Sequence, residues 1–228
     1  MVLPERVWLL RHAETTAPHV LNGSESDVPL SDFGEQQAEL LGRWFVSHRP
    51  TAVVSSTMIR AVQTAVPISR DCGVPHSQEP LLRERSIGTL SGQPFHLTVG
   101  PWAETVQQWT AGNTAFTTLG AESFDALKLR LHDGWRNVLA AHPGGRVVIV
   151  AHGIVCKVLL LTLLHGWDVG GWEKIGRIAN ASVSELFPGA GGLWHSEKIL
   201  EVPESIVRLA DPSQLPGSVR SEACMNWY

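Results

Sequence analysis

The chain has 228 residues, of which 43% are hydrophobic and 18% charged, and its formal net charge is −4. These values are typical of a soluble globular protein, and at this length we expect one α/β domain over residues 1–228, with a core that needs no disulfide or metal ion. The acidic balance argues against a nucleic-acid surface, which requires an excess of basic residues.

The cysteines and the apolar segments bear on the compartment. Cys72, Cys156 and Cys224 match neither a zinc-binding spacing nor a disulfide framework, which indicates a reducing compartment. The apolar stretch near the start is too short for a signal peptide, and no stretch reaches the ~18 apolar residues of a membrane span. We therefore expect a cytoplasmic protein without a membrane or nucleic-acid partner. Whether it forms a homodimer is left open.

Residues 7–13 and 147–153 share one arrangement, an apolar strand that ends in polar residues. The first strand ends in Arg11 and His12, and the second in His152. Continuous apolar runs of this kind are typical of strands buried on both faces of a parallel sheet, whose ligands bind at the carboxyl ends of the strands. If the two strands are neighbours, a spacing of ~4.8 Å brings both histidines to one ligand. An arginine beside two histidines favours a compact anion, and phosphate is the obvious candidate.

After the first strand, the sequence predicts a loop over residues 13–34, a helix over residues 35–47 and a second strand over residues 52–55. Ser56 or Thr57 should cap the next helix, which places Arg60 in its first turn. Pro67 should end or kink that helix.

Residues 86–121 combine glycine and proline with aromatic side chains, and we expect a lid with one short helix near 102–110. The elements expected after the lid are a helix over 122–142, a strand over 147–151, a helix over 154–165, late strands over 183–187 and 193–200, and an irregular tail over about 203–228. This alternation predicts a three-layer α/β sandwich with a mostly parallel central sheet, helices on both faces, and the lid over the carboxyl ends of the strands.

Five residues suit phosphoryl transfer. His12 is a candidate nucleophile toward phosphorus if its attacking nitrogen is unprotonated. Arg11 and Arg60 offer guanidinium forks for phosphate oxygens, and the amino terminus of a helix supports Arg60. His152 offers a further donor. Glu84, which follows the third strand region, is the best-placed acid for protonating a leaving oxygen.

Other residues near these positions have simpler interpretations. Arg83 and Arg85 flank Glu84, so an exposed charge cluster is the alternative to a catalytic acid. Glu14 could line the pocket, although ordering of the loop is the simpler role.

The lid and the helix after the second histidine leave further alternatives. His96 could touch the substrate. Trp102 and Trp109 could face either the substrate or the core, and Cys156 is expected in the core.

Six motifs then occur in an order that resembles the histidine phosphatase superfamily, in the branch that contains cofactor-dependent phosphoglycerate mutases and many small phosphatases. The likeness extends over about residues 6–188. The motifs are RHAET at 11–15, SSTMIRAVQTA at 55–65, LLRERSIGTLSG at 81–92, AESF at 121–124, VAHG at 150–153 and NASV at 180–183.

The resemblance implies a role for each matching residue. His12 matches the histidine that becomes phosphorylated, and Glu84 matches the proton donor. Arg11, Arg60 and His152 match the phosphate pocket. Neither a metal ion nor another cofactor is implied for this step.

Two departures concern the walls of the pocket. Ala13 stands where the family usually has glycine, which adds only a methyl group. Pro18 stands where the family has an asparagine, so we expect Asn22 or the amide of Gly23 to supply that phosphate contact.

The resemblance favours hydrolysis over phosphoryl transfer to a second substrate. Only 68 residues separate Glu84 from His152, an arrangement shorter than that of the mutases, and a shorter lid lets water reach the phosphohistidine. We therefore expect a metal-independent phosphatase that acts on a small phosphomonoester metabolite. The alternatives are a phosphoglycerate-type mutase and a non-catalytic protein that binds a phosphorylated ligand; the complete set of five residues argues against the second.

Overall fold

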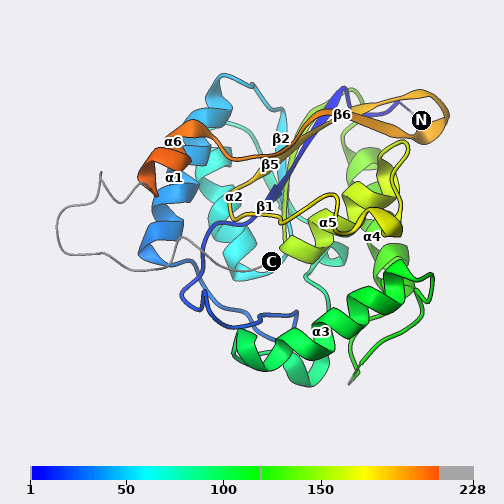
Figure 1. Ribbon diagram of the computed structural model, residues 1–228. Coiled ribbons are helices and arrows are strands. Elements are labelled where there is room, and N and C mark those ends of the chain that lie inside the picture. Colours follow the sequence, from blue (N-terminus) through cyan, green and yellow to red (C-terminus); the bar gives the residue numbers. More distant parts are fainter. Residues whose placement is uncertain (1, 119, 211–228) are drawn as a thin grey trace.

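A six-stranded sheet organises the computed structural model, which describes residues 2–118 and 120–210 (Figure 1). Its strand order is β3-β2-β4-β1-β5-β6. The strands are β1 Arg6–Arg11, β2 Ala52–Ser55, β3 His76–Gln78, β4 Arg146–Ala151, β5 Val183–Pro188 and β6 Trp194–Glu201. Strands β1 to β4 are parallel to one another, β5 is antiparallel to β1, and β6 is antiparallel to β5, so the expected mostly parallel sheet is confirmed.

Strands β1 and β4 lie side by side in the middle of the sheet, with Arg11 opposite Ala151 at their carboxyl ends. Alternate side chains of a strand point to opposite faces. Leu9 therefore joins one buried apolar cluster, and Leu10 joins the cluster on the other face. Since both strands run the same way and end together, the residues that follow them meet at one edge.

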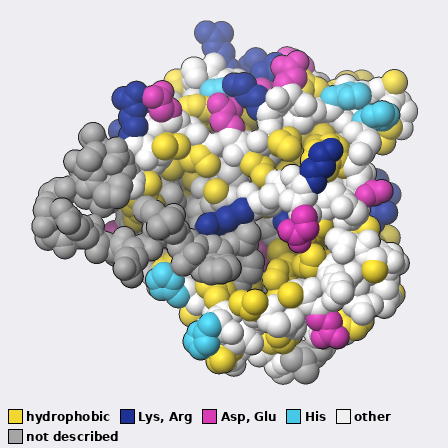
Figure 2. Space-filling view, in the orientation of Figure 1, with side chains coloured by type: hydrophobic (Ala, Val, Ile, Leu, Met, Phe, Trp, Pro, Cys, Tyr) yellow, Lys and Arg dark blue, Asp and Glu magenta, His cyan; other side chains and the backbone are white. Residues whose placement is uncertain are grey.

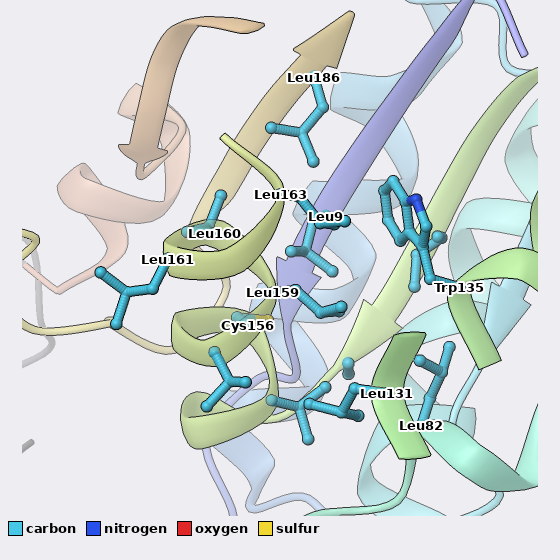
Figure 3. Close-up of a cluster of buried hydrophobic side chains, with 14 of the residues drawn as sticks. Leu9, Leu82, Leu131, Trp135, Cys156, Leu159, Leu160, Leu161, Leu163 and Leu186 are labelled. Carbon is cyan, nitrogen blue, oxygen red and sulfur yellow. The ribbon is translucent and has the colours of Figure 1, made fainter. Parts of the chain in front are cut away.

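Helices cover both faces of the sheet (Figure 1), as expected. They are α1 Asp32–Val46, α2 Ile59–Cys72, α3 Phe95–Thr110, α4 Phe124–Ala141, α5 Gly153–Leu163 and α6 Glu204–Leu209. Helices α1 and α2 pack on one face, and α4 and α5 on the other. Figure 3 shows Leu159 of α5 between Leu9 of β1 and Leu131 of α4. Full burial of one such side chain stabilises the fold by roughly 1.5–3 kcal/mol.

Helix α1 begins at Asp32, earlier than the expected start at residue 35. The oxygen Oγ of Ser31 accepts a hydrogen bond from the amide of Gly34 at 3.0 Å. This side-chain cap satisfies one of the free N–H groups of the first turn, so the helix extends to it.

Helix α2 differs from the expectation at both ends. Its N-cap is Met58, which makes no side-chain cap, and Ser56 instead accepts from the amide of Met58 at 3.3 Å. Pro67 was expected to end or kink the helix, and it does not end it, because the helix continues through Pro67 to Cys72; the kink stays a prediction. A proline inside a helix costs about 3 kcal/mol. Close packing of α1 on α2 offsets this cost, since a Cβ on Gly42 would lie 2.9 Å from the carbonyl oxygen of Pro67.

The lid and the tail hold more helix than expected. Helix α3 spans Phe95–Thr110 in place of a short helix near 102–110, and it passes through Pro101. The tail is not irregular from residue 203, because α6 follows Pro203 and buries Ile206 against the cluster of α1 and α2. The remaining tail, including Cys224, lies outside the described residues.

The surface carries charges of both signs (Figure 2), and the described helices are not of the membrane-spanning type. Basic and acidic side chains are interspersed over the described part of the face in Figure 2. Within residues 2–118 and 120–210, no helix has the length and the apolar character that crossing a membrane requires.

Candidate active site

A cavity of about 120 Å³ opens at the carboxyl ends of β1 and β4. Arg11, His12, Arg60 and Glu84 line it together, although they lie far apart in the sequence. His152 does not line the cavity but packs behind it, with its ring centroid 5.2 Å from that of His12. The structure therefore brings the five predicted residues to one place, with four on the cavity wall and one beneath it.

His12 has one ring nitrogen committed to a hydrogen bond. Its Nδ1 lies 2.7 Å from the carbonyl oxygen of Ala13. A carbonyl oxygen can only accept, so Nδ1 carries the proton, and Nε2 of the neutral ring keeps its lone pair. Burial lowers the pKa of His12 well below its usual value, and the charges of Arg60 and Arg11 lower it further. The free ring is therefore neutral near pH 7, as a nucleophile must be.

Arg11 and Arg60 supply positive charge, and not all of their N–H donors are used by acceptors in the described part of the chain. Arg11 donates from Nη1 to the carbonyl oxygen of Ile178 at 2.6 Å, while its buried Nε has no partner among the described residues. Arg60, in the first turn of α2, donates from Nη1 to the carbonyl oxygen of Ser26 at 2.8 Å. Burial lowers the pKa of Arg11 to about 10, which leaves it charged at neutral pH. An anion in the cavity would supply the missing acceptors.

His152 follows β4 and is fully buried. Its Nε2 lies 2.8 Å from Oγ of Ser56, and its buried Nδ1 has no partner among the described residues. Burial, and then the charge of Arg60 and the neighbouring His12, lower the pKa of His152 well below its usual value. His152 is thus a neutral ring that packs edge-on against His12, with one nitrogen left for a further hydrogen bond; its expected contact with phosphate stays a prediction.

Glu84 is 8% exposed, so the alternative of an exposed charge cluster is wrong for this residue. Its Oε1 accepts from the amide of Arg85 at 2.8 Å, and its Oε2 accepts from the amide of Ile154 at 3.3 Å. Burial raises the pKa of Glu84, despite those hydrogen bonds and the nearby arginine charges. A raised pKa keeps more of this carboxyl protonated near neutral pH, as a general acid requires.

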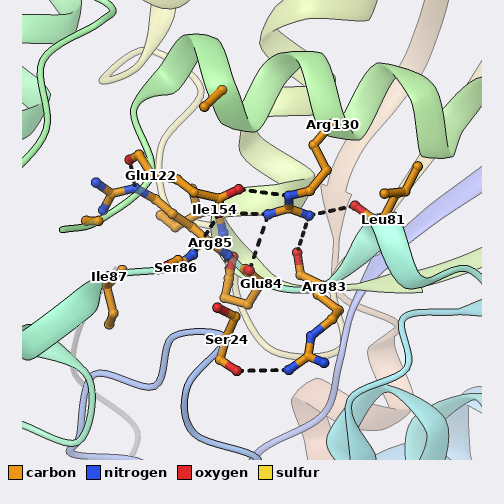
Figure 4. Close-up of polar contacts among 12 residues, drawn as sticks. Ser24, Leu81, Arg83, Glu84, Arg85, Ser86, Ile87, Glu122, Arg130 and Ile154 are labelled. Atoms are coloured by element: carbon orange, nitrogen blue, oxygen red, sulfur yellow. Dashed lines mark hydrogen bonds and ion pairs between the residues drawn. The ribbon is translucent and has the colours of Figure 1, made fainter.

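Arg130 of α4 holds the segment that carries Glu84 (Figure 4). It donates from Nη1 to the carbonyl oxygens of Leu81 at 2.6 Å and Arg83 at 2.9 Å. Its Nε and Nη2 each lie 2.8 Å from a carboxylate oxygen of Glu122. The sequence alone does not mark Arg130 as functional, because a single arginine in an amphipathic helix looks the same as an exposed arginine on the surface.

Arg85 is a second residue that the sequence analysis missed. It lines the cavity beside Glu84, and its guanidinium lies 4.9 Å from the ring centroid of Trp109 and 5.3 Å from that of Trp102. Its Nε donates to the carbonyl oxygen of Glu122 at 2.8 Å, while its buried Nη2 has no partner among the described residues. Burial lowers the pKa of Arg85 to about 10. The site therefore contains a third charged arginine. In the sequence, only the position of Arg85 next to Glu84 could have indicated that it belongs to the site.

Asn180, from the last motif, positions the nucleophile. Its Nδ2 donates to the carbonyl oxygens of His12 at 3.0 Å and Ala13 at 3.2 Å. It thereby ties the loop before β5 to the end of β1.

The residues expected to replace the missing asparagine lie on the cavity wall. Asn22 donates from Nδ2 to the carbonyl oxygens of Ala17 at 3.2 Å and Val20 at 3.1 Å. The amide of Gly23 donates to Oγ of Ser91 at 3.3 Å. The donors of Asn22 therefore bind within the loop, and the amide of Gly23 binds the segment that follows Leu90, so the phosphate contact expected of the two residues stays a prediction.

The alternatives for the neighbouring residues are resolved by their positions. Glu14 accepts from Oγ of Ser31 at 2.8 Å, so it orders the loop as expected, and it also lines the cavity. His96 is exposed and lines neither of the two cavities described here. Trp109 and Cys156 are buried in the core, whereas Trp102 lies on the cavity wall. Within residues 2–118 and 120–210, no group of three or more His, Cys, Asp or Glu side chains is arranged to hold a metal ion.

Comparisons with known proteins agree with this geometry. A metal-independent phosphoserine phosphatase of Arabidopsis thaliana is 33% identical over 192 residues, which cover 77% of this chain and 73% of that protein. A probable phosphoglycerate mutase of Yersinia pestis is 31% identical over 183 residues, which cover 79% and 84% of the two chains.

Solved structures share the fold. A mycobacterial glucosyl-3-phosphoglycerate phosphatase has a TM-score of 0.73 at 25% identity, over 86% of this chain and 98% of that one. The α-ribazole phosphatase of Shigella flexneri has a TM-score of 0.70 at 22% identity, over 86% and 96%. The profile of the histidine phosphatase superfamily (branch 1) matches residues 7–199. The chain therefore belongs to the histidine phosphatase superfamily, as the order of its motifs predicts.

Proposed function

We propose that the protein is a metal-independent phosphatase that hydrolyses a small phosphomonoester through a phosphohistidine on His12. The observation that carries this proposal is the arrangement in one cavity of a neutral His12, charged Arg11 and Arg60, and Glu84 with a raised pKa. Phosphatase relatives on both the sequence and the structure side support the hydrolytic activity.

The reaction has two displacements. In the first, Nε2 of His12 attacks phosphorus, the bond from phosphorus to the ester oxygen breaks, and Glu84 gives its proton to the departing alkoxide. In the second, water attacks the phosphohistidine, Glu84 takes a proton from it, and the bond from nitrogen to phosphorus breaks to release phosphate. Positioned acid–base catalysis contributes about 10²–10⁴-fold. The arginines therefore supply the larger share by stabilising negative charge in a partly dry site.

Hydrolysis is favoured over mutase activity by the geometry of the lid. Helix α3, with Trp102, is the lid element on the cavity wall, and the Glu84 to His152 interval of 68 residues is short. The cavity stays open to water, which competes with a second substrate hydroxyl for the phosphohistidine.

Phosphate release from p-nitrophenyl phosphate tests the proposal. We expect the wild-type protein to turn over this ester in EDTA and without any added bisphosphate, whereas His12→Ala abolishes turnover. The control is His165→Ala, an exposed histidine away from the cavity, which should retain activity. Full turnover by a folded His12→Ala variant contradicts the assignment, as does a chelator-sensitive activity that a divalent metal restores.

The location and the assembly of the protein stay predictions. The cysteine pattern supports a cytoplasmic protein, which acts either alone or as a homodimer.

A further inference from the structure

A second cavity, of about 530 Å³, adjoins the phosphate cavity between α3 and α5. The two cavities share four residues of their walls, Phe95, Trp102, Gly153 and Ile154. A group attached to a phosphate in the first cavity can therefore extend into the second.

The wall of this second cavity is mostly apolar and holds one cationic side chain. Val106, Trp172 and Ile178 contribute apolar surface, and Lys157 of α5 contributes the ammonium. Lys157 is 8% exposed, and its Nζ lies 4.7 Å from the ring centroid of Trp172. Among residues 2–118 and 120–210, no hydrogen bond and no ion pair is found for this ammonium, which lies at the cavity wall.

The ammonium of Lys157 lies at the wall of the second cavity and not among the fully buried atoms without a partner. Burial lowers the pKa of Lys157 to about 8, although Glu173 opposes this shift. Most molecules therefore carry the charge at neutral pH. Contact with an aromatic face compensates the partial loss of water around a cation only in part, so an anionic group in the cavity would stabilise this charge further.

We propose that the second cavity binds the leaving group of the substrate, and that Lys157 pairs with a carboxylate at the far end of an apolar body in that group. The inference rests on the proposed phosphatase function and names its substrate class. A carboxylate suits the site better than a second phosphate, because a single ammonium balances one negative charge and the carboxylate of Glu173 also lines the wall.

The position of Lys157 places the acidic end of this substrate. Lys157 lies on α5 beyond Ile154, which both cavities share, and it lines the second cavity alone. A carboxylate that pairs with Lys157 is therefore joined to the phosphate by a group that crosses the shared wall. The substrate class is an amphipathic phosphomonoester with an acidic end.

Two synthetic esters test the inference. They are 3-(4-phosphonooxyphenyl)propanoate and its primary amide, which share one aryl leaving group and differ in one remote charge. We expect wild-type kcat/KM to be about tenfold higher for the acid, since a charge-assisted hydrogen bond exceeds a neutral one by about that factor. The difference should lie in KM, because the remote contact is the same in the ground state and in the transition state.

Variants assign the preference to Lys157. Lys157→Met should bring the ratio of the two esters close to one, and Lys157→Arg should retain it. The control is Lys174→Met, which removes an exposed lysine that lies over Trp167 and lines neither cavity, and which should retain the full ratio. If the methionine variant does not fold, Lys157→Gln takes its place with the same expectation.

A wild-type ratio near one overturns the inference without any variant, and so does a high ratio that Lys157→Met or Lys157→Gln leaves in place. The proposed function fails separately, if the wild-type protein releases no phosphate from p-nitrophenyl phosphate. Phosphate release with a ratio near one removes only the carboxylate subsite.

Discussion

At the residue scale, burial shifts the pKa values of His12 and Glu84 in opposite directions. It lowers the pKa of the histidine and raises that of the carboxyl, so each moves toward the form that the first displacement needs. The sequence could name both residues from their motifs. It could not show that both are buried, which is the physical cause of the shifts, because burial depends on how distant segments pack.

The role of Glu84 as the acid predicts a dependence on the leaving group. Glu84→Gln should lower kcat/KM, which reports the first displacement, by about 10²–10⁴-fold for alkyl phosphates, whose alkoxides need a proton to depart. It should have little effect on kcat/KM for p-nitrophenyl phosphate, whose leaving group is stable as an anion. Steady-state kinetics with a series of esters measures this slope. Glu104→Gln, which removes an exposed carboxylate of α3, is the control. Equal losses of kcat/KM across the series contradict the assignment.

The same two groups predict the pH profile of kcat/KM. Activity requires neutral His12, so it falls on the acid side as the ring gains a proton. It also requires protonated Glu84, so it falls on the alkaline side as the carboxyl ionises. Because the pKa of His12 is lowered and that of Glu84 is raised, we expect an optimum on the acid side of neutrality. Glu84→Gln should remove the alkaline limb. An alkaline limb that persists in this variant assigns it to another group.

At the element scale, α4 fixes the catalytic acid although it contributes no residue that the sequence marks as functional. Arg130 joins the backbone around Glu84 to Glu122, which lies just before the same helix. The helix was predictable from its amphipathic pattern, but the contact joins segments more than 40 residues apart and was not. Helix α2 likewise depends on a contact between distant segments, because its packing on α1 overrides the local preference of Pro67 to end the helix.

The contact of Arg130 predicts an effect on activity that exceeds the loss of stability. Arg130→Met should lower the free energy of unfolding by about 1–3 kcal/mol, because it leaves the partly buried carboxylate of Glu122 with the amide of Ser86 as its remaining donor. It should also lower kcat/KM more for poor leaving groups than for good ones, since it acts through Glu84. Urea unfolding and ester kinetics measure the two effects. Arg136→Met, in an exposed ion pair of the same helix, is the control. A uniform loss of kcat/KM over all esters would mean that Arg130 does not act through Glu84.

At the scale of the whole molecule, the site depends on the topology of the sheet. The apolar runs of β1 and β4 predicted two buried parallel strands, and the adjacency of those strands brings His12 and His152 together. The α/β class, the two covered faces and most element ranges were predictable, because each follows from local periodicity. The start of α1, the length of α3 and the presence of α6 depend on caps and contacts that periodicity does not contain.

Two buried neutral histidines also make stability depend on pH. Their pKa values are lowered in the folded state, so below pH ~6.5 the unfolded state binds more protons than the folded one. The free energy of unfolding should therefore fall as pH decreases through that value, by up to ~1.4 kcal/mol per pH unit for each histidine, and the loss is absent above it. Urea unfolding at several pH values measures the slope.

A variant with both His12→Gln and His152→Gln should have a smaller slope between neutral and mildly acid pH, whatever its stability at pH 7. The control is His96→Gln, which removes an exposed histidine and should leave the slope unchanged. An unchanged slope in the double variant would show that the two rings are not buried in their neutral forms.

The covalent intermediate on His12 is the most direct test of the account. The protein is mixed with p-nitrophenyl phosphate in a rapid-quench apparatus, stopped in alkali, where phosphohistidine survives, and digested for mass spectrometry. We predict a phosphoryl group on His12 that forms before steady-state turnover and is missing from His12→Ala. A phosphoryl group on His152, or turnover with no labelled histidine at any time point, would contradict the account.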